Sequence, residues 1–369
     1  MKIMVVASWY RSENNPTRGS FIREQALAIA KLGVEVHVVS IDRSRLRLPL
    51  TVLTSRDGPL VEHSIAAIWP LHRLLGFYLP WPLIGKLRKI ADSVQPDVVH
   101  AHAVRPAGYI ASRLQGFPLV ITEHSGPLRD FWSTAHGFRH IESAYLKADR
   151  RIAVSTALLQ EVEELFPSTR GLWEVVPNGI DTSLFACASQ PQRAGDVLYV
   201  GSLDENKDLP TLLDAMASLE DSTSLTIAGT GPAEGFIRRR SESLGIAERV
   251  SLLGPVSRQR VAELMRSHRV FALPSRRETF GIVCAEALSC GTPVVATRCG
   301  GPEHVVPEFG GKLVPVGNAE AFAGALRQVL MNPGKFSPHR LHDYVAEYFS
   351  MTSVATRLQQ VYHEVAGNA

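Results

Sequence analysis

The segment Arg269–Thr297, RVFALPSRRETFGIVCAEALSCGTPVVAT, contains two apolar runs with a helical pattern between them. The runs RVFALPS (269–275) and PVVAT (293–297) are short and typical of buried strands. The pattern between them stops at Gly291, a residue type that commonly follows a helix. Strand, helix and strand in this order predict two parallel strands with a helix packed across them.

The same alternation continues along the chain. Further apolar runs predict strands at 2–8, 34–40, 96–102, 118–124, 150–155, 197–202, 225–229, 250–254 and 312–316. A helix is expected at 21–33, and the alternation fades at 184–196, an irregular segment that contains Pro191. The pattern predicts an α/β protein with two doubly wound, Rossmann-like domains, 1–186 and 187–350, followed by a helical tail at about 351–366.

Composition excludes several classes of protein. The chain has 369 residues with 45% hydrophobic and 20% charged side chains, which is typical of a globular protein of two domains. A net charge of +3 and the lack of a basic tail argue against a nucleic-acid partner. The longest apolar stretch, LLGFYLPWPLIG (74–85), is too short to span a membrane. The chain opens with a strand-like run, so no signal peptide is expected, and its four cysteines show no zinc spacing. These features predict a cytoplasmic protein with reduced thiols.

Two carboxylates frame the helix of the first segment. Glu278 lies in the turn after the strand, and Glu286 lies two turns further on, within the helix. The unpaired N–H groups at a helix start favour phosphate, and carboxylates can accept the hydroxyls of a sugar or a ribose. The alternative is a solvated loop glutamate and a buried, ion-paired helix glutamate, and the spacing alone does not decide between them.

The surrounding residues resemble a known family. The stretch ETFGIVCAEALSCGTPVVAT (278–297) is similar to the donor-site motif of the retaining glycosyltransferases of family 4, which have the GT-B fold. Other landmarks of that family are PNGID (177–181), VGSLDENKDLPTLLDAM (200–216), IAGTGP (227–232), VSLLGPV (250–256) and LPSRRETFG (273–281). The resemblance covers most of the chain and is closer in the second domain.

The resemblance implies an architecture and an activity. An acceptor-binding first domain and a donor-binding second domain would face each other across a cleft, with the helix at about 351–369 crossing back to the first domain. The enzyme would move a sugar from a UDP-, GDP- or ADP-sugar to an acceptor hydroxyl with retention of configuration and without a cofactor. Cell-envelope polysaccharide, glycolipid and secondary-metabolite glycosylation are the expected settings, and a lipid-linked acceptor is one alternative.

The resemblance also implies residue roles in the donor site. Glu278 would hold the hydroxyls of the donor sugar, Glu286 the ribose, and the backbone at Val256 the base. The diphosphate would meet the backbone amides of Thr279, Phe280, Gly281 and Ile282. No Asp-x-Asp pair occurs in the chain, so a site without metal is expected.

A cation is expected beside the leaving diphosphate. Lys207 follows the strand that ends near Gly201, and a lysine there can neutralise the departing phosphates; the alternative is a surface lysine. The family usually pairs this lysine with an arginine, but Ser202 takes that position here. Arg18 and Arg298 are candidates to replace the missing charge.

The first domain contributes two candidates. His124 ends the strand PLVITEH (118–124), where the family has a histidine that faces the donor sugar; the alternative is a core or capping histidine. His100 and His102 are expected to be structural. Gly19, in NPTRGSF (15–21), would let the backbone approach phosphate and acceptor, or would be an ordinary turn glycine.

Three alternatives to a glycosyltransferase remain open from the sequence. GTGPAEG (229–235) resembles a dinucleotide fingerprint, which would suit a nicotinamide oxidoreductase, but its glycine spacing is off by one, and a strand-to-helix turn is expected. A sugar-nucleotide epimerase of the same fold and a binding protein without activity, suggested by Ser202, are the other two.

Two segments combine basic, aromatic and leucine residues, as membrane-surface segments do. They are RSRLRLPLTVL (43–53) and HRLLGFYLPWPLIGKLRKI (72–90). The favoured interpretation is a helix of the first domain that buries its leucines. Peripheral contact with the inner face of a membrane is the alternative.

Overall fold

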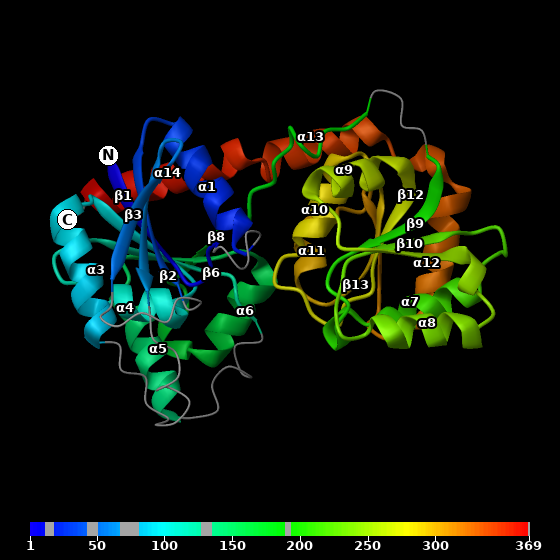
Figure 1. Ribbon diagram of the computed structural model, residues 1–369, viewed down its shortest axis with the longest axis horizontal. Coiled ribbons are helices and arrows are strands. Elements are labelled where there is room, and N and C mark those ends of the chain that lie inside the picture. Colours follow the sequence, from blue (N-terminus) through cyan, green and yellow to red (C-terminus); the bar gives the residue numbers. More distant parts are fainter. Residues whose placement is uncertain (12–17, 43–50, 67–80, 127–134, 189–192, 368–369) are drawn as a thin grey trace. The chain divides into compact units, whose positions relative to one another are not determined.

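The computed structural model describes residues 1–11, 18–42, 51–66, 81–126, 135–188 and 193–367. The chain forms two compact α/β units (Figure 1). The first contains residues 1–154, 158–179 and 351–369, and the second contains 155–157 and 180–350. The chain therefore passes between units at Gly179–Ile180, a few residues before the irregular segment that the sequence singled out.

The first unit is built on an eight-stranded sheet of order β3-β4-β2-β1-β5-β6-β7-β8. Its strands are β1 (Lys2–Ala7), β2 (Glu35–Asp42), β3 (Val52–Asp57), β4 (Leu60–Ala66), β5 (Val98–His102), β6 (Leu119–Glu123), β7 (Arg150–Ala153) and β8 (Trp173–Val175). All neighbours are parallel except the β3–β4 hairpin. The strand interiors are buried because apolar residues point to both faces, as parallel sheets require.

Helices cover this sheet, and the last of them comes from the end of the chain. They are α1 (Ser20–Lys31), α3 (Trp81–Val94), α4 (Tyr109–Ala111), α5 (Ala135–Lys147), α6 (Thr156–Leu165) and α14 (Met351–Gly367). In Figure 1, α14 lies beside α1. Val354, Leu358 and Tyr362 of α14 share a core with Ile22 and Ile29 of α1. The final helix thus belongs to the first unit, as predicted.

The second unit has a six-stranded, fully parallel sheet of order β11-β10-β9-β12-β13-β14. Its strands are β9 (Gly195–Val200), β10 (Leu225–Ala228), β11 (Val250–Gly254), β12 (His268–Leu273), β13 (Val294–Thr297) and β14 (Gly311–Val314). Its helices are α7 (Leu209–Ala217), α8 (Glu234–Ser243), α9 (Arg258–Ser267), α10 (Ile282–Ser289), α11 (Gly301–Val305), α12 (Ala319–Met331) and α13 (Pro338–Tyr348). Helix α7 packs against α8 and α12, and α10 packs against α9, α11 and α13, so that two groups of helices enclose the sheet (Figure 1).

The strand order fixes where this sheet can bind a ligand. From β9 the chain adds β10 and β11 on one side and then returns to add β12, β13 and β14 on the other. The loops after β9 and β12 therefore leave in opposite directions and open a crevice at the carboxyl ends of these neighbouring strands. Ligands of doubly wound sheets bind at such a point.

Part of each membrane-surface candidate lies outside the described residues, namely 43–50 and 72–80. The described remainder of the second candidate lies in α3, which buries Leu83, Leu87 and Ile90 and exposes Arg88 and Lys89. In the part of the chain that the structure describes, no helix is long and apolar enough to cross a membrane.

Candidate active site

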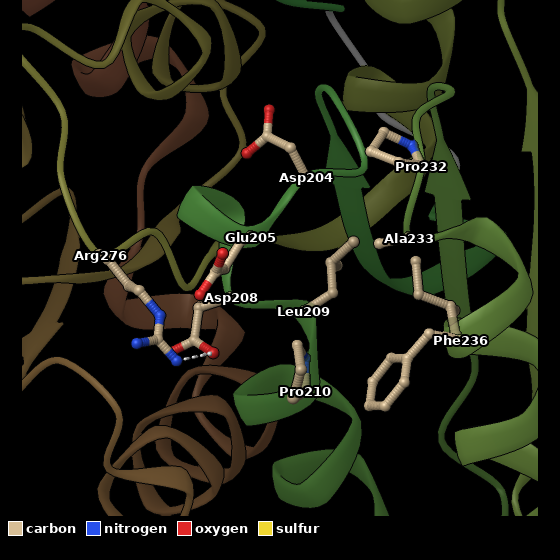
Figure 2. A pocket seen from close by; sticks show the side chains of 10 residues that line it. Asp204, Glu205, Asp208, Leu209, Pro210, Pro232, Ala233, Phe236 and Arg276 are labelled. Atoms are coloured by element: carbon tan, nitrogen blue, oxygen red, sulfur yellow. Dashed lines mark hydrogen bonds and ion pairs between the residues drawn. The ribbon is translucent and has the colours of Figure 1, made fainter.

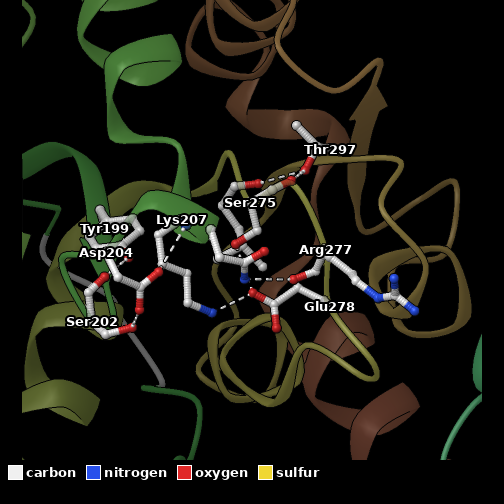
Figure 3. A network of polar contacts seen from close by, with 10 residues as sticks. Tyr199, Ser202, Asp204, Lys207, Ser275, Arg277, Glu278 and Thr297 are labelled. Carbon is white, nitrogen blue, oxygen red and sulfur yellow. Dashed lines mark hydrogen bonds and ion pairs between the residues drawn. The ribbon is translucent and has the colours of Figure 1, made fainter. Parts of the chain in front are cut away.

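The crevice of the second sheet contains an ion pair between its two loops. Lys207 follows β9, Glu278 follows β12, and Lys207 Nζ lies 2.6 Å from Glu278 Oε1 (Figure 3). The same oxygen accepts a hydrogen bond from Ser275 Oγ at 2.7 Å. Only 18% of the Lys207 side chain and 15% of the Glu278 side chain are exposed. Neither residue is the solvated surface side chain that the alternative interpretation required.

The two loops are fastened to each other by Asn206. Its carbonyl accepts from Arg276 N at 2.7 Å, and its Nδ2 donates to the Arg277 carbonyl at 3.0 Å. The short 3₁₀ turn Glu205–Lys207 is capped by Asp204, whose carboxylate accepts from Lys207 N at 3.3 Å. These bonds set the direction in which the Lys207 side chain leaves its loop.

Ser202 brings no charge to this loop. Its hydroxyl donates to Asp204 Oδ2 at 2.6 Å, and its carbonyl accepts from Tyr199 Oη at 2.7 Å (Figure 3). Where the family has an arginine, this chain therefore has a hydroxyl that holds a carboxylate. Of the two candidate replacements, Arg298 is an exposed residue just after β13, and Arg18 belongs to the first unit.

Glu278 also leads directly into the start of α10. Its amide donates to the Cys299 carbonyl at 3.1 Å, and its carbonyl accepts from Gly301 N at 2.7 Å. Gly281 caps the helix with φ 81°, a left-handed conformation that favours glycine. Phe280 is buried against the ring of Phe349, with 5.8 Å between centroids. The amides of 279–282 are thus carried on a turn that is fixed on both sides.

Glu286 is a buried residue of α10 with a basic partner. Arg258 Nη2 lies 3.3 Å from Glu286 Oε1, and 10% of the Glu286 side chain is exposed. Arg258 begins α9, directly after the Val256–Ser257 turn, and Ser257 caps that helix by accepting from Arg260 N at 3.2 Å. Arg258 therefore links Glu286 to the turn that contains Val256. The burial and the ion pair are those of the alternative interpretation of Glu286, although the sequence did not indicate which residue would be the partner.

The glycine-rich turn 229–235 packs against the loop that carries Lys207. Leu203 N donates to the Thr230 carbonyl at 3.0 Å, and Ala233 N donates to the Leu203 carbonyl at 2.9 Å. A Cβ atom on Gly229 would lie 1.8 Å from the Gly201 carbonyl oxygen, and one on Gly231 would lie 2.4 Å from the Leu203 carbonyl oxygen. Close packing of two loops accounts for these glycines without a dinucleotide.

A cavity of about 320 Å³ borders the same loop, and Asp204, Glu205 and Asp208 are among the residues that line it (Figure 2). Leu209, Pro210 and Phe236 form its apolar wall, and Asp204 and Glu205 line its acidic side. Arg276 Nη2 lies 3.2 Å from Asp208 Oδ1 at its edge. Among the described residues, no group of three histidine, cysteine or acidic side chains is arranged to hold a metal ion.

The candidates of the first unit lie at the carboxyl ends of β1 and β6. Gly19 caps α1 with φ 66°, and a Cβ atom there would lie 2.4 Å from the Trp9 carbonyl oxygen, so packing requires this glycine. His124 is buried, with its Nε2 2.9 Å from His102 Nδ1 and its ring 5.0 Å from that of Phe21. Burial lowers the His124 pKa to about 3, so the ring is neutral near pH 7.

His100 and His102 differ in their partners. His100 bonds Tyr362 Oη and Thr122 Oγ1, each at 2.7 Å, within the core of the first unit. His102 instead contacts His124, a partnership that the sequence did not reveal.

Comparisons with known proteins identify the family. Residues 19–184 match the model of "Glycosyltransferase Family 4", and residues 188–347 match "Glycosyl transferases group 1". A D-inositol 3-phosphate glycosyltransferase of Nocardiopsis dassonvillei is 30% identical over 352 residues, covering 85% of this chain and 81% of that protein. Sucrose-phosphate synthase of Thermosynechococcus elongatus has a similar structure, with a TM-score of 0.80, 21% identity and full coverage of both chains. Anabaena HepE in complex with UDP gives a TM-score of 0.77 at 19% identity, covering 99% of this chain and 100% of that one.

The fold and the matched sequence define a glycosyltransferase of the GT-B class. The chain belongs to glycosyltransferase family 4, the glycosyl transferases of group 1. The resemblance seen in the sequence is thereby confirmed.

Proposed function

We propose that the crevice at β9 and β12 binds the diphosphate and sugar of a nucleoside-diphosphate sugar, and that transfer proceeds with retention and without a metal ion. The observation that carries this proposal is the Lys207–Glu278 ion pair at the crossover of the second sheet. It brings together the side-chain types that such a donor needs, one cation for phosphate and one carboxylate for hydroxyls.

The ion pair suggests how the site would receive its donor. A diphosphate carries more negative charge than one carboxylate, so it would draw Lys207 away from Glu278. Glu278 would then be free to accept hydroxyls of the sugar, while Ser275 keeps hold of one carboxylate oxygen. As the sugar leaves, Lys207 would stabilise the charge that grows on the diphosphate.

The remaining donor contacts follow from α10 and its neighbours. The amides of Thr279, Phe280, Gly281 and Ile282 lie at the positive end of the helix and would bind the phosphates. Glu286 would accept the ribose hydroxyls, with Arg258 orienting its carboxylate. The backbone at Val256 would meet the base.

The chemistry would follow a front-face route. The acceptor oxygen bonds to the anomeric carbon as the bond from that carbon to the diphosphate oxygen breaks, and the acceptor proton passes to the departing phosphate. Glu278 then binds sugar hydroxyls and does not act as a nucleophile. His124, in the first unit, is proposed to take part in this step.

Thermal unfolding with nucleotides tests the donor site. The purified chain would be heated with UDP, GDP, ADP or NAD, each with and without magnesium. A diphosphate at about 100 times its dissociation constant adds roughly 2.7 kcal/mol to the free energy of unfolding. We expect a magnesium-independent rise in melting temperature with one diphosphate, and UDP is the first candidate because the HepE structure contains it. A rise with NAD alone would refute the proposal.

Activity assays separate transfer from the rival functions. Donor sugars are incubated with and without hydroxyl acceptors, among them inositol phosphates, the substrate class in the name of the relative above. Nucleotide release that requires an acceptor supports transfer. Conversion of the donor sugar without an acceptor would indicate an epimerase, and binding without release would indicate an inactive binding protein. Sedimentation with anionic vesicles at low and high salt tests membrane contact separately.

A further inference from the structure

A buried carboxylate lies directly before His124. Glu123, the last residue of β6, has no exposed surface. Its Oε2 accepts from Val104 N at 2.9 Å and from Tyr145 Oη at 2.8 Å. Its Oε1 accepts from His124 N at 3.0 Å, from Ser125 N at 2.9 Å and from the Ser125 hydroxyl.

The contacts of Glu123 point to an ionised acceptor. All five contacts are donors, which a deprotonated carboxylate receives and a protonated one does not match. No ion pair to Glu123 is found within the described part of the chain. Burying a carboxylate costs free energy even when it is hydrogen-bonded, and an apolar core residue would serve stability alone at least as well. Such a group calls for a role beyond packing.

The segments that Glu123 joins are those that carry the contacting histidines. Val104 follows β5, whose last residue is His102, and His124 follows β6. Ala103, which lies between His102 and Val104, has φ 63°, an unusual value for alanine. The surrounding contacts therefore hold the backbone after β5 in a disfavoured conformation. Glu123 therefore fixes the two strand ends at the spacing that brings His102 Nδ1 within 2.9 Å of His124 Nε2.

The two ring nitrogens of His124 differ in their surroundings. Nε2 is occupied by His102, whereas Nδ1 is buried and meets no hydrogen-bond partner among the described residues. The carboxamide of Asn178 is near enough to influence the His124 pKa but does not reach hydrogen-bond geometry with Nδ1.

We propose that Glu123 is a positioning residue for transfer, which acts by holding the His124 backbone and the His102–His124 contact in the arrangement that transfer requires. This inference rests on the role of His124 in the proposed function. Glu123 itself touches no substrate.

Glutamine cannot replace this carboxylate. A carboxamide has one acceptor oxygen and one donor NH₂, whereas both oxygens of Glu123 receive donors. Glu123→Gln can thus satisfy the Val104 and Tyr145 side or the His124 and Ser125 side, but not both.

A double-mutant cycle tests the proposal in the full chain. We expect Glu123→Gln and His124→Ala each to lower kcat at least tenfold, and the double variant to be no slower than the slower single variant. The affinity for nucleoside diphosphate should stay within twofold of wild type in all three, because those contacts belong to the second unit. Multiplying effects in the double variant, or a wild-type kcat in Glu123→Gln, would overturn the proposal.

Two milder variants test the two oxygens of the Glu123 carboxylate separately. Ser125→Ala removes a donor on the His124 side and should lower kcat severalfold. Tyr145→Phe removes a donor from the other oxygen and should leave kcat near wild type. Equal kcat values in these two variants would contradict the proposal even if Glu123→Gln does not fold.

Histidine ring ¹⁵N resonances separate this inference from the proposed function. In the wild type, the signals of His102 and His124 should show one fixed neutral tautomer each, and Glu123→Gln should shift both. If His124→Ala keeps full activity, His124 is removed from the proposed reaction, and with it the catalytic purpose assigned to Glu123. Unchanged ring signals in Glu123→Gln would overturn the positioning itself, whatever the activity of His124→Ala.

Discussion

At the scale of single residues, substitutions of Glu278 and Lys207 should both lower kcat but should differ in their effect on diphosphate affinity. Glu278→Gln removes the charge that Lys207 now faces, so the affinity for free nucleoside diphosphate should stay equal or rise while kcat falls at least 100-fold. Lys207→Met should lower both, with about a tenfold loss of diphosphate affinity. Calorimetric titration and nucleotide release measure the two quantities.

Glu205→Gln is the matched control for this pair. Glu205 is an exposed carboxylate two residues before Lys207 in the same turn, and its substitution should leave both quantities unchanged. Near-normal turnover of Glu278→Gln would show that the donor site lies elsewhere.

Ser202 offers a test by restoring the residue type of the family. An arginine at this exposed position can reach toward the diphosphate, and Asp204 would lose its hydrogen bond from Ser202 Oγ. A partly exposed charge contact contributes up to about 1 kcal/mol, so Ser202→Arg should tighten diphosphate binding by about fivefold. Ser202→Ala separates the added cation from the lost hydroxyl, and equal affinities of the two variants would contradict the expectation.

The sequence predicted only those site residues that lie in recognisable motifs. Glu278, Glu286 and Lys207 were proposed because they lie in recognisable motifs after strands or in a helix. The Lys207–Glu278 pair joins residues that are 71 positions apart, and only the strand order brings them together. Arg258 and Glu123 were missed because an arginine at a helix start and a glutamate at a strand end look like ordinary surface residues until burial and partners are known.

At the scale of elements, the glycine-rich turn and the Lys207 loop should behave as one piece. Gly231→Ala places a Cβ atom 2.4 Å from the Leu203 carbonyl oxygen, which forces the Lys207 loop to move. We expect the free energy of unfolding to fall by roughly 2 kcal/mol and diphosphate affinity to fall with it. Denaturant unfolding and calorimetric titration test both.

Gly235→Ala, in the same motif, is the control for that substitution. Gly235 lies in α8, and its added Cβ would meet only the flexible end of Arg239, at 3.5 Å. Replacing a helical glycine by alanine should raise stability by about 0.5–1 kcal/mol and leave binding unchanged. If both variants behaved alike, packing against the loop would not explain the turn.

Element prediction succeeded where burial is complete and failed for three strands of the first sheet. Strands such as β12 and β13 were predicted because their residues are continuously apolar, as a sheet covered on both faces demands. Strand β4 was missed although it lies inside the sheet, because the polar residues 62–64 interrupt its apolar residues. Strand β3 was missed because four of its six residues are exposed, and β8 because it has only three residues. Neither gives a periodic apolar signal in the sequence.

At the scale of the whole molecule, stability should decrease in acid. Burial lowers the pKa of His100 and His124 to about 3, whereas an unfolded histidine titrates near 6.5. Between these values the unfolded chain binds protons that the native chain does not, so stability falls as the pH falls from about 6.5 toward 3. Each histidine adds a slope of up to about 1.4 kcal/mol per pH unit.

Denaturant unfolding of wild type and His100→Gln between pH 7 and pH 5 measures that slope. The variant should have a slope smaller by about 1 kcal/mol per pH unit, whereas substitution of the exposed His363 on α14 should leave it unchanged. Identical slopes for wild type and His100→Gln would show that His100 is not held neutral.

The return of α14 to the first unit also sets an order in which the chain can become complete during synthesis. A ribosome finishes 180–350, nearly all of the second unit, before it makes Met351, so the first unit lacks α14 until after the second unit has been synthesised. Until then Ile22 and Ile29 lack the apolar partners that α14 supplies. The nascent first unit would therefore expose an apolar surface while the second unit is synthesised. The second unit could then complete its fold before the first, which reverses the usual order in which N-terminal domains fold first.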